Sequence, residues 1–138
     1  MDKRTVDLLV EKAIEAREKS YSPSSGFAVG AALLANDGRI FTGANIENSS
    51  YTPTVCAERV AVFTAVHAGY RDFSAIAIVG GKAGEKITEL CPPCGVCRQV
   101  LAEFAGGDLK VILSDGTDTE VLTLSELLPR GFSRDNLK

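Results

Sequence analysis

The sequence predicts an α/β protein built on a mixed five-stranded sheet. Helical and strand-like segments follow one another in the order α β β α β α β β α. Strands separated by helices predict parallel neighbours, whereas the turn signals Asn36-Asp37-Gly38 and Asp115-Gly116 predict two antiparallel hairpins. With 138 residues, of which 45% are hydrophobic and 24% charged, the chain is expected to form one globular domain over residues 1–138.

Each element is recognised by the spacing of its apolar residues and by the residues that flank it. Apolar residues at helical spacing predict the first helix, with Thr5 as a candidate N-cap, and short apolar runs between turn residues predict the strands. The expected elements are a helix over 5–19, strands over 27–35 and 39–46, a helix over 56–68, a strand over 73–79, a helix from about 94 to 105, strands over 110–113 and 120–124, and a short helix over 125–128 before an irregular tail.

The helix expected over 56–68 is apolar on nearly every face. A helix of this kind is normally buried on all sides. In so small a domain its own sheet can cover only one side. We therefore expect the remaining faces to contact another subunit.

Charge and hydropathy favour a small ligand in a cytoplasmic protein. The net charge is −3, and no basic stripe is present to neutralise the phosphates of a nucleic acid. No apolar run reaches the roughly 20 residues that cross a bilayer, and the amino terminus lacks the pattern of a signal peptide. In a reducing compartment, the four cysteines favour metal ligation or thiol chemistry over disulfides.

Three of the cysteines have the spacing of a metal site. Cys94 and Cys97 lie at i and i+3 on one expected helix, and Cys56 begins another. Three protein ligands with a fourth position open are typical of catalytic zinc. Two alternatives remain: a redox C-x-x-C pair, or a closed structural zinc site that uses Cys91 as a fourth ligand. Otherwise Cys91 is an ordinary buried or loop cysteine.

Glu58 follows Cys56 by two positions, in the first turn of the same helix. A carboxylate there can simply complement the helix dipole. Zinc chemistry gives a second reason, because zinc lowers the pKa of a bound water and the reaction then needs a base near the metal. Glu58 is the candidate catalytic residue for that proton transfer.

Together, Cys56-Ala57-Glu58 and Pro93-Cys94-Gly95-Val96-Cys97 match the zinc-deaminase signature in its three-cysteine form. The chain resembles the small, homotetrameric cytidine deaminases over most of its length. The resemblance implies a three-layer α/β/α fold, one Zn²⁺ per subunit, and active sites shared between subunits. It also implies hydrolytic deamination of cytidine and 2′-deoxycytidine, in pyrimidine salvage. The stretches that carry it are Phe27 to Leu33, Asn45 to Asn48, Cys56 to Arg59, Pro93 to Gln99, Leu127 to Pro129 and Phe132-Ser133.

The resemblance also assigns residues to the nucleoside. Asn45 and Glu47 would hydrogen-bond the ribose 3′-hydroxyl, and Phe27 would pack on the pyrimidine. Without the family, a phenylalanine in a strand such as Phe27 is more often a core residue than a ligand contact, and the pair Asn45 and Glu47 is interpreted as a solvated strand end. Because the pair lies two positions apart in an extended segment, both side chains should point to one side.

Four further residues complete the implied site. Ala57 would contact the substrate, Tyr51 would lie near a shared site, and Phe132 would stack on the base in a neighbouring subunit. Three thiolates around Zn²⁺ leave a net charge of −1, so a nearby cation is needed to keep bound water acidic. Arg59 is the candidate, through hydrogen bonds to the cysteine sulfurs.

Three rival functions differ in testable ways. A deaminase for a cytosine-containing antibiotic such as blasticidin S would depart at the glutamate of Asn45-Ile46-Glu47, which is intact here. A structural zinc module would need Cys91 on the metal. A polynucleotide deaminase is disfavoured by the acidic charge balance.

Overall fold

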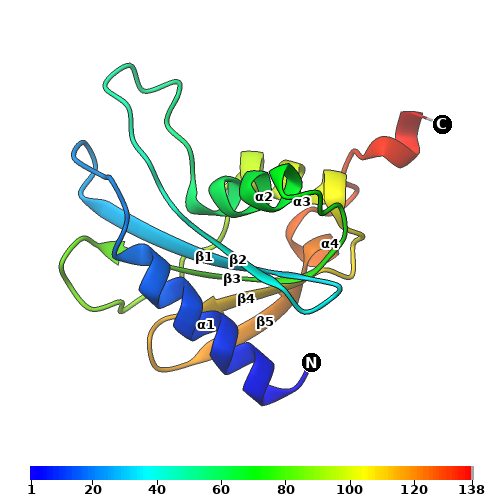
Figure 1. The fold of residues 1–138 in the computed structure, drawn as a ribbon, viewed down its shortest axis with the longest axis horizontal. Coiled ribbons are helices and arrows are strands. Elements are labelled where there is room, and N and C mark those ends of the chain that lie inside the picture. The colour runs from blue at the N-terminus through cyan, green and yellow to red at the C-terminus, as the bar shows by residue number, and fades with distance from the viewer. Residues whose placement is uncertain (138) are drawn as a thin grey trace.

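The computed structural model describes residues 1–137 and has the predicted mixed sheet (Figure 1). The strands lie in the order β2-β1-β3-β4-β5. Only the β3–β4 pair is parallel, and the other three pairs are antiparallel. The elements are α1 Lys3–Arg17, β1 Phe27–Ala35, β2 Ile40–Ala44, α2 Ala57–His67, β3 Phe73–Lys82, α3 Gly95–Phe104, β4 Lys110–Ser114, β5 Thr119–Thr123, α4 Leu124–Leu127 and a 3-10 helix Arg134–Leu137.

Most boundaries lie within one or two residues of the sequence-based prediction, and specific contacts explain the start of α1 and the end of β3. The N-cap of α1 is Asp2, whose Oδ1 accepts a hydrogen bond of 2.8 Å from the Thr5 backbone N–H, so Thr5 lies inside the first turn. β3 continues to Lys82 and pairs with β1 from Phe27 onward. The predicted strand ended at residue 79, but antiparallel pairing with β1 keeps Gly80 and Gly81 in the sheet.

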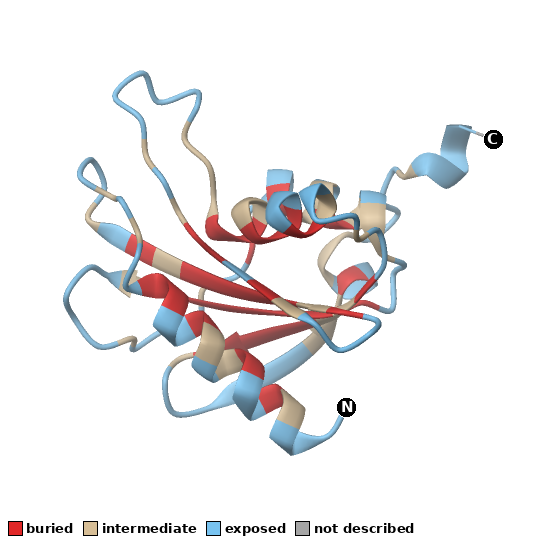
Figure 2. Cartoon of the chain, viewed as in Figure 1, coloured by how far each residue is buried: buried red, intermediate tan, exposed pale blue. Residues whose placement is uncertain are grey.

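The sheet separates two apolar cores and makes three layers. α1 covers one face, where Leu9 and Ala13 are fully buried, while α2, α3 and α4 lie on the other (Figures 1 and 2). α1 is a 15-residue helix that presents only one side to the sheet. None of the helices within residues 1–137 is long and apolar enough to cross a membrane.

α2 lies unusually close to the sheet because small residues meet at the contact. A Cβ on Gly43 of β2 would come within 2.6 Å of both Ala57 O and Ala61 N. The opposite side of α2 is not covered in the single chain, and Phe63 there is 50% exposed (Figure 2). The sheet therefore covers one side of this apolar helix, as expected.

The fold gathers several chain segments at one end of the sheet. β1 begins there with Phe27, which pairs with Lys82 at the end of β3, and the loops before β1 and after β3 lie at the same end (Figure 1). The long connection after β2 leads from this end to the amino terminus of α2. This end therefore brings Phe27 close to the connection that leads from β2 to Cys56 at the start of α2.

Candidate active site

Three thiols meet where two helices begin. Cys56 is the N-cap of α2, Cys94 is the N-cap of α3, and Cys97 lies in the first turn of α3. Their Sγ atoms all lie within 4.8 Å of one another, and Cys56 Sγ is 3.8 Å from Cys94 Sγ. A tetrahedral zinc with Zn–S bonds of about 2.3 Å needs sulfur atoms about 3.8 Å apart. The three thiols therefore fit one zinc ion.

Cys91 does not belong to this cluster. It lies beside Gly80, where an added Cβ would approach its Sγ to 2.8 Å and the ring of Phe27 to 3.1 Å. Burial, together with the charges of Glu58 and Cys56, raises the pKa of the Cys91 thiol to about 11. Three cysteines without Cys91 leave the fourth coordination position open, as a catalytic site requires.

The environment of Cys56 stabilises a thiolate. A hydrogen bond from Cys97 lowers the pKa of Cys56 most, and the Arg59 guanidinium lowers it further, to about 5. Arg59 Nη2 donates to Cys56 Sγ over 3.4 Å. The Cys97 backbone N–H donates to Cys94 Sγ, also over 3.4 Å. Arg59 thus places a positive charge beside Cys56 Sγ.

Glu58 is a buried carboxyl group close to the cysteines. Its side chain lies in the first turn of α2 and is only 4% exposed. Its Oε1 has no hydrogen-bond partner among the described residues. Burial, and secondarily the charge of Cys56, raises the pKa of Glu58 to about 7. A carboxyl group with a pKa near neutrality can both accept and return a proton.

Asn45 and Glu47 both reach towards the loop before β1. The Asn45 amide bridges the β1 backbone, because its Nδ2 donates to Phe27 O over 2.8 Å and its Oδ1 accepts from Val29 N over 2.9 Å. The Glu47 carboxylate accepts from Ser24 N over 2.7 Å and also from the Ser25 hydroxyl, and the Ser25 bond chiefly lowers the pKa of Glu47. Asn45 thus fixes the start of β1, whereas Glu47 fixes the loop that precedes it.

The remaining predicted contact residues lie in different places. Phe27 is 44% exposed, at the start of β1, so it is not a core residue. Ala57 is fully buried at the start of α2. Tyr51 is 73% exposed, with a positive φ of 64°. Phe132 is 58% exposed in the carboxyl-terminal tail, where its carbonyl accepts from Gln99 Nε2 over 2.8 Å.

Sequence reasoning missed the buried Arg17 of α1. This residue is 7% exposed, and its guanidinium donates to Ala28 O over 3.0 Å and to Lys82 O over 2.6 Å. It thereby joins the start of β1, next to Phe27, to the end of β3. The signal was present, since Arg17 follows Leu9 and Ala13 at intervals of eight and four on the apolar face of its helix.

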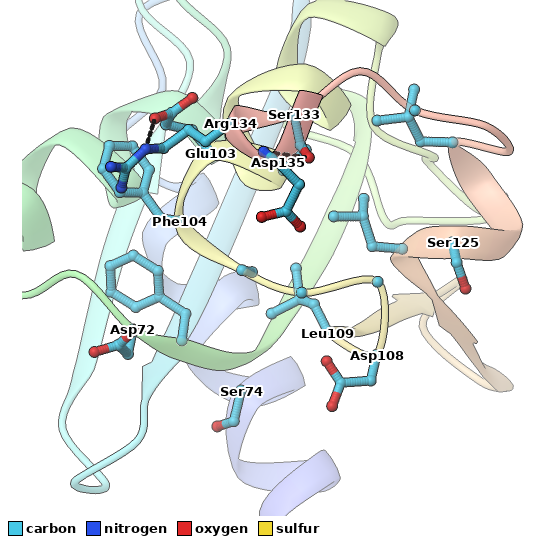
Figure 3. A pocket seen from close by; sticks show the side chains of 18 of the residues that line it. Asp72, Ser74, Glu103, Phe104, Asp108, Leu109, Ser125, Ser133, Arg134 and Asp135 are labelled. Carbon is cyan, nitrogen blue, oxygen red and sulfur yellow. Dashed lines mark hydrogen bonds and ion pairs between the residues drawn. The ribbon is translucent and has the colours of Figure 1, made fainter. Parts of the chain in front are cut away.

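A large hollow of about 1680 Å³ lies elsewhere, between the start of β3, the end of α3 and the tail (Figure 3). Phe104, Asp108 and Leu109 line it, together with Ser133 to Asp135. Its lining residues include neither Glu58 nor any of the four cysteines. Its size therefore does not make it the reactive site, because the ionisable cluster lies at the opposite end of α3.

Three thiols spaced for a tetrahedral ion, a buried carboxyl group beside them and an open fourth position define a zinc site of the hydrolytic kind. The family model described as "Cytidine and deoxycytidylate deaminase zinc-binding region" matches residues 3–113. The chain belongs to this family.

Individual relatives agree with this family. A cytidine deaminase of Sporosarcina psychrophila is 48% identical over 133 residues, which cover 96% of this chain and 94% of the relative. A cytidine deaminase of Halalkalibacterium halodurans is 48% identical over 131 residues, which cover 94% of this chain and 96% of the relative. The crystal structure of cytidine deaminase from Burkholderia pseudomallei has a TM-score of 0.83 at 46% identity, covering 96% of this chain and all of that one.

Proposed function

We propose that the chain hydrolyses cytidine and 2′-deoxycytidine to uridine and 2′-deoxyuridine with release of ammonia. The observation that carries this proposal is the buried Glu58 carboxyl, whose Oε1 has no hydrogen-bond partner among the described residues, beside a three-thiol zinc site. The names of relatives at 48% identity support the choice of nucleoside.

Glu58 is the proton carrier of the proposed reaction. Cys56, Cys94 and Cys97 would hold the zinc ion, which would supply the Lewis acidity that makes a water molecule nucleophilic. Glu58 accepts the proton that water loses as its oxygen attacks C4 of the pyrimidine, and delivers it to N3. It then takes up the second proton of that oxygen and passes it to the departing amine, so that water and cytidine become uridine and ammonia. Arg59 holds Cys56 and offsets the negative charge of the thiolates.

The nucleoside is proposed to bind at the open end of the sheet. Phe27 offers an exposed ring beside Cys91, and Asn45 keeps one amide hydrogen beyond its bond to Phe27 O. This hydrogen and the half-buried carboxylate of Glu47 are suited to the ribose 3′-hydroxyl. We place Ala57 at the base, because it lies between Cys56 and Glu58 at the start of α2.

We further propose a homotetramer whose sites are shared between subunits, acting in pyrimidine salvage in the cytoplasm. Three large apolar side chains support an assembly, since Phe63, Val96 and Phe132 are 50%, 57% and 58% exposed in the single chain. Tyr51 and Phe132, which extend from the chain body, would then reach a neighbour's site. The net charge of −3 favours a nucleoside over a nucleic acid as substrate.

Loss of absorbance at the cytidine band, measured with purified protein together with zinc per chain, tests this function. We expect turnover of cytidine and 2′-deoxycytidine with one zinc per chain. Deoxycytidylate and blasticidin S serve as comparison substrates. Turnover of either without turnover of the nucleosides would overturn the assignment, as would zinc-loaded protein inactive on all four. Sedimentation analysis tests the tetramer separately.

A further inference from the structure

The carboxyl-terminal tail is fastened to one face of α3. Gln99 Nε2 donates to Phe132 O over 2.8 Å, and Arg134 Nε forms an ion pair with Glu103 Oε2 at 3.6 Å (Figure 3). Gln99 and Glu103 are four residues apart and so lie on the same side of the helix. One helix face therefore holds the tail at two successive points.

The same helix holds the metal-binding cysteines at its other end. Cys94 and Cys97 lie at its amino terminus, two turns or less from Gln99. Arg98 adds a second connection, because its Nε donates to Pro93 O over 2.8 Å and its Nη1 donates to Leu127 O over 2.6 Å. Two consecutive residues of α3, Arg98 and Gln99, thus connect the carboxyl-terminal part of the chain to the helix that carries Cys94 and Cys97.

We propose that Gln99 is a positioning residue that sets the place of Phe132 for stacking on the substrate base. The proposal rests on the proposed function. Because the Phe132 ring is 58% exposed, little packing fixes it within the chain, and the placement of its backbone matters more. The hydrogen bond from Gln99 falls on the Phe132 carbonyl itself. Since the chain around Phe132 lies at the surface, losing this bond should displace the ring without disturbing the core.

Gln99→Ala tests the proposal through two independent measurements. The first is tryptic cleavage after Arg130 or Arg134, which reports on release of the tail. The second is kcat and KM for cytidine, because a ring that binds ground state and transition state alike affects KM and not kcat. The net contribution of one hydrogen bond corresponds to an increase of about 2- to 12-fold in the rate of tryptic cleavage and in KM. Zinc per chain and Tm should stay at the parent values.

The Phe132→Ala background separates positioning from a general structural effect. There Gln99→Ala should still hasten cleavage, since it bonds the backbone, but should change KM by less than about twofold because the ring is gone. Glu11→Ala, which removes an exposed polar side chain from α1, is the matched control and should change neither measurement.

Unchanged cleavage in Gln99→Ala would overturn the docking of the tail whatever the activity. Faster cleavage with parental KM would overturn the role in substrate binding, as would an undiminished KM effect in the Phe132→Ala background. If the parent protein does not deaminate cytidine, the substrate role falls together with the proposed function. In that case cleavage alone decides whether Gln99 holds the tail.

Discussion

Replacing Glu58 by glutamine removes the proposed proton carrier and keeps the shape of the side chain. A well-placed acid or base contributes about 10²- to 10⁴-fold to a rate. Glu58 is proposed to act at two steps, so we expect kcat for cytidine to fall by at least about 10³-fold.

The structure also gives an upper limit for the effect on stability. Glu58 is 4% exposed and its Oε1 has no partner among the described residues, so an amide there meets a similar unsatisfied environment. A buried unpaired polar group costs about 1–3 kcal/mol, and this cost is present both in the parent protein and in Glu58→Gln. We therefore expect the free energy of unfolding to change by less than about 2 kcal/mol, a Tm shift below about 10 °C.

Absorbance kinetics, zinc per chain and thermal unfolding of Glu58→Gln measure these three quantities together. Zinc should remain at one per chain, because Glu58 is not in the thiol cluster. Activity within tenfold of the parent at full zinc would refute the role of Glu58 in proton transfer. Loss of zinc would instead show that Glu58 helps to hold the metal.

Three further substitutions test the surroundings of the site. Cys91→Ser should keep zinc and activity, because Cys91 lies outside the thiol cluster, whereas Cys94→Ser should lose both. Zinc analysis of the two proteins tests this, and loss of zinc from Cys91→Ser would contradict the three-ligand site. Arg59→Ala removes the hydrogen bond to Cys56 Sγ and should lower zinc affinity about 10- to 100-fold in a chelator competition. An affinity equal to that of the parent protein would contradict the role of Arg59. Gly43→Ala brings a Cβ within 2.6 Å of the α2 backbone and should lower the free energy of unfolding by about 1–3 kcal/mol in urea, whereas an unchanged midpoint would mean that α2 can move away without cost.

Local sequence was sufficient for most elements because their periods and turn residues act over short distances. The two hairpins follow from Asn36-Asp37-Gly38 and Asp115-Gly116, and all five strands were predicted. Boundaries depended on finer contacts. Asp2 rather than Thr5 caps α1 because its carboxylate reaches a free backbone N–H, and β3 extends to Lys82 because β1 lies beside it.

The substrate residues show where local reasoning ends. Asn45 and Glu47 were predicted to point to one side, and the structure shows their partners: Asn45 bonds the start of β1 and Glu47 bonds the loop before it. Their bonds to Phe27 O and Ser24 N could not be read from a strand pattern. The buried Arg17 likewise needs its partners, Ala28 O and Lys82 O, to explain a charged residue on an apolar helix face.

By itself the sequence determined the donor set: thiols for zinc at the starts of two helices, two of them at i and i+3, and a carboxyl group in the first turn beside the third. Only the tertiary structure decided that Cys56 lies 3.8 Å from Cys94, 38 positions away, that Cys91 stands apart, and that Glu58 is buried. The physical reason is that these distances depend on how α2 and α3 pack on the same face of the sheet. That packing is fixed by close contacts such as that of Gly43 with Ala57, which no local pattern contains.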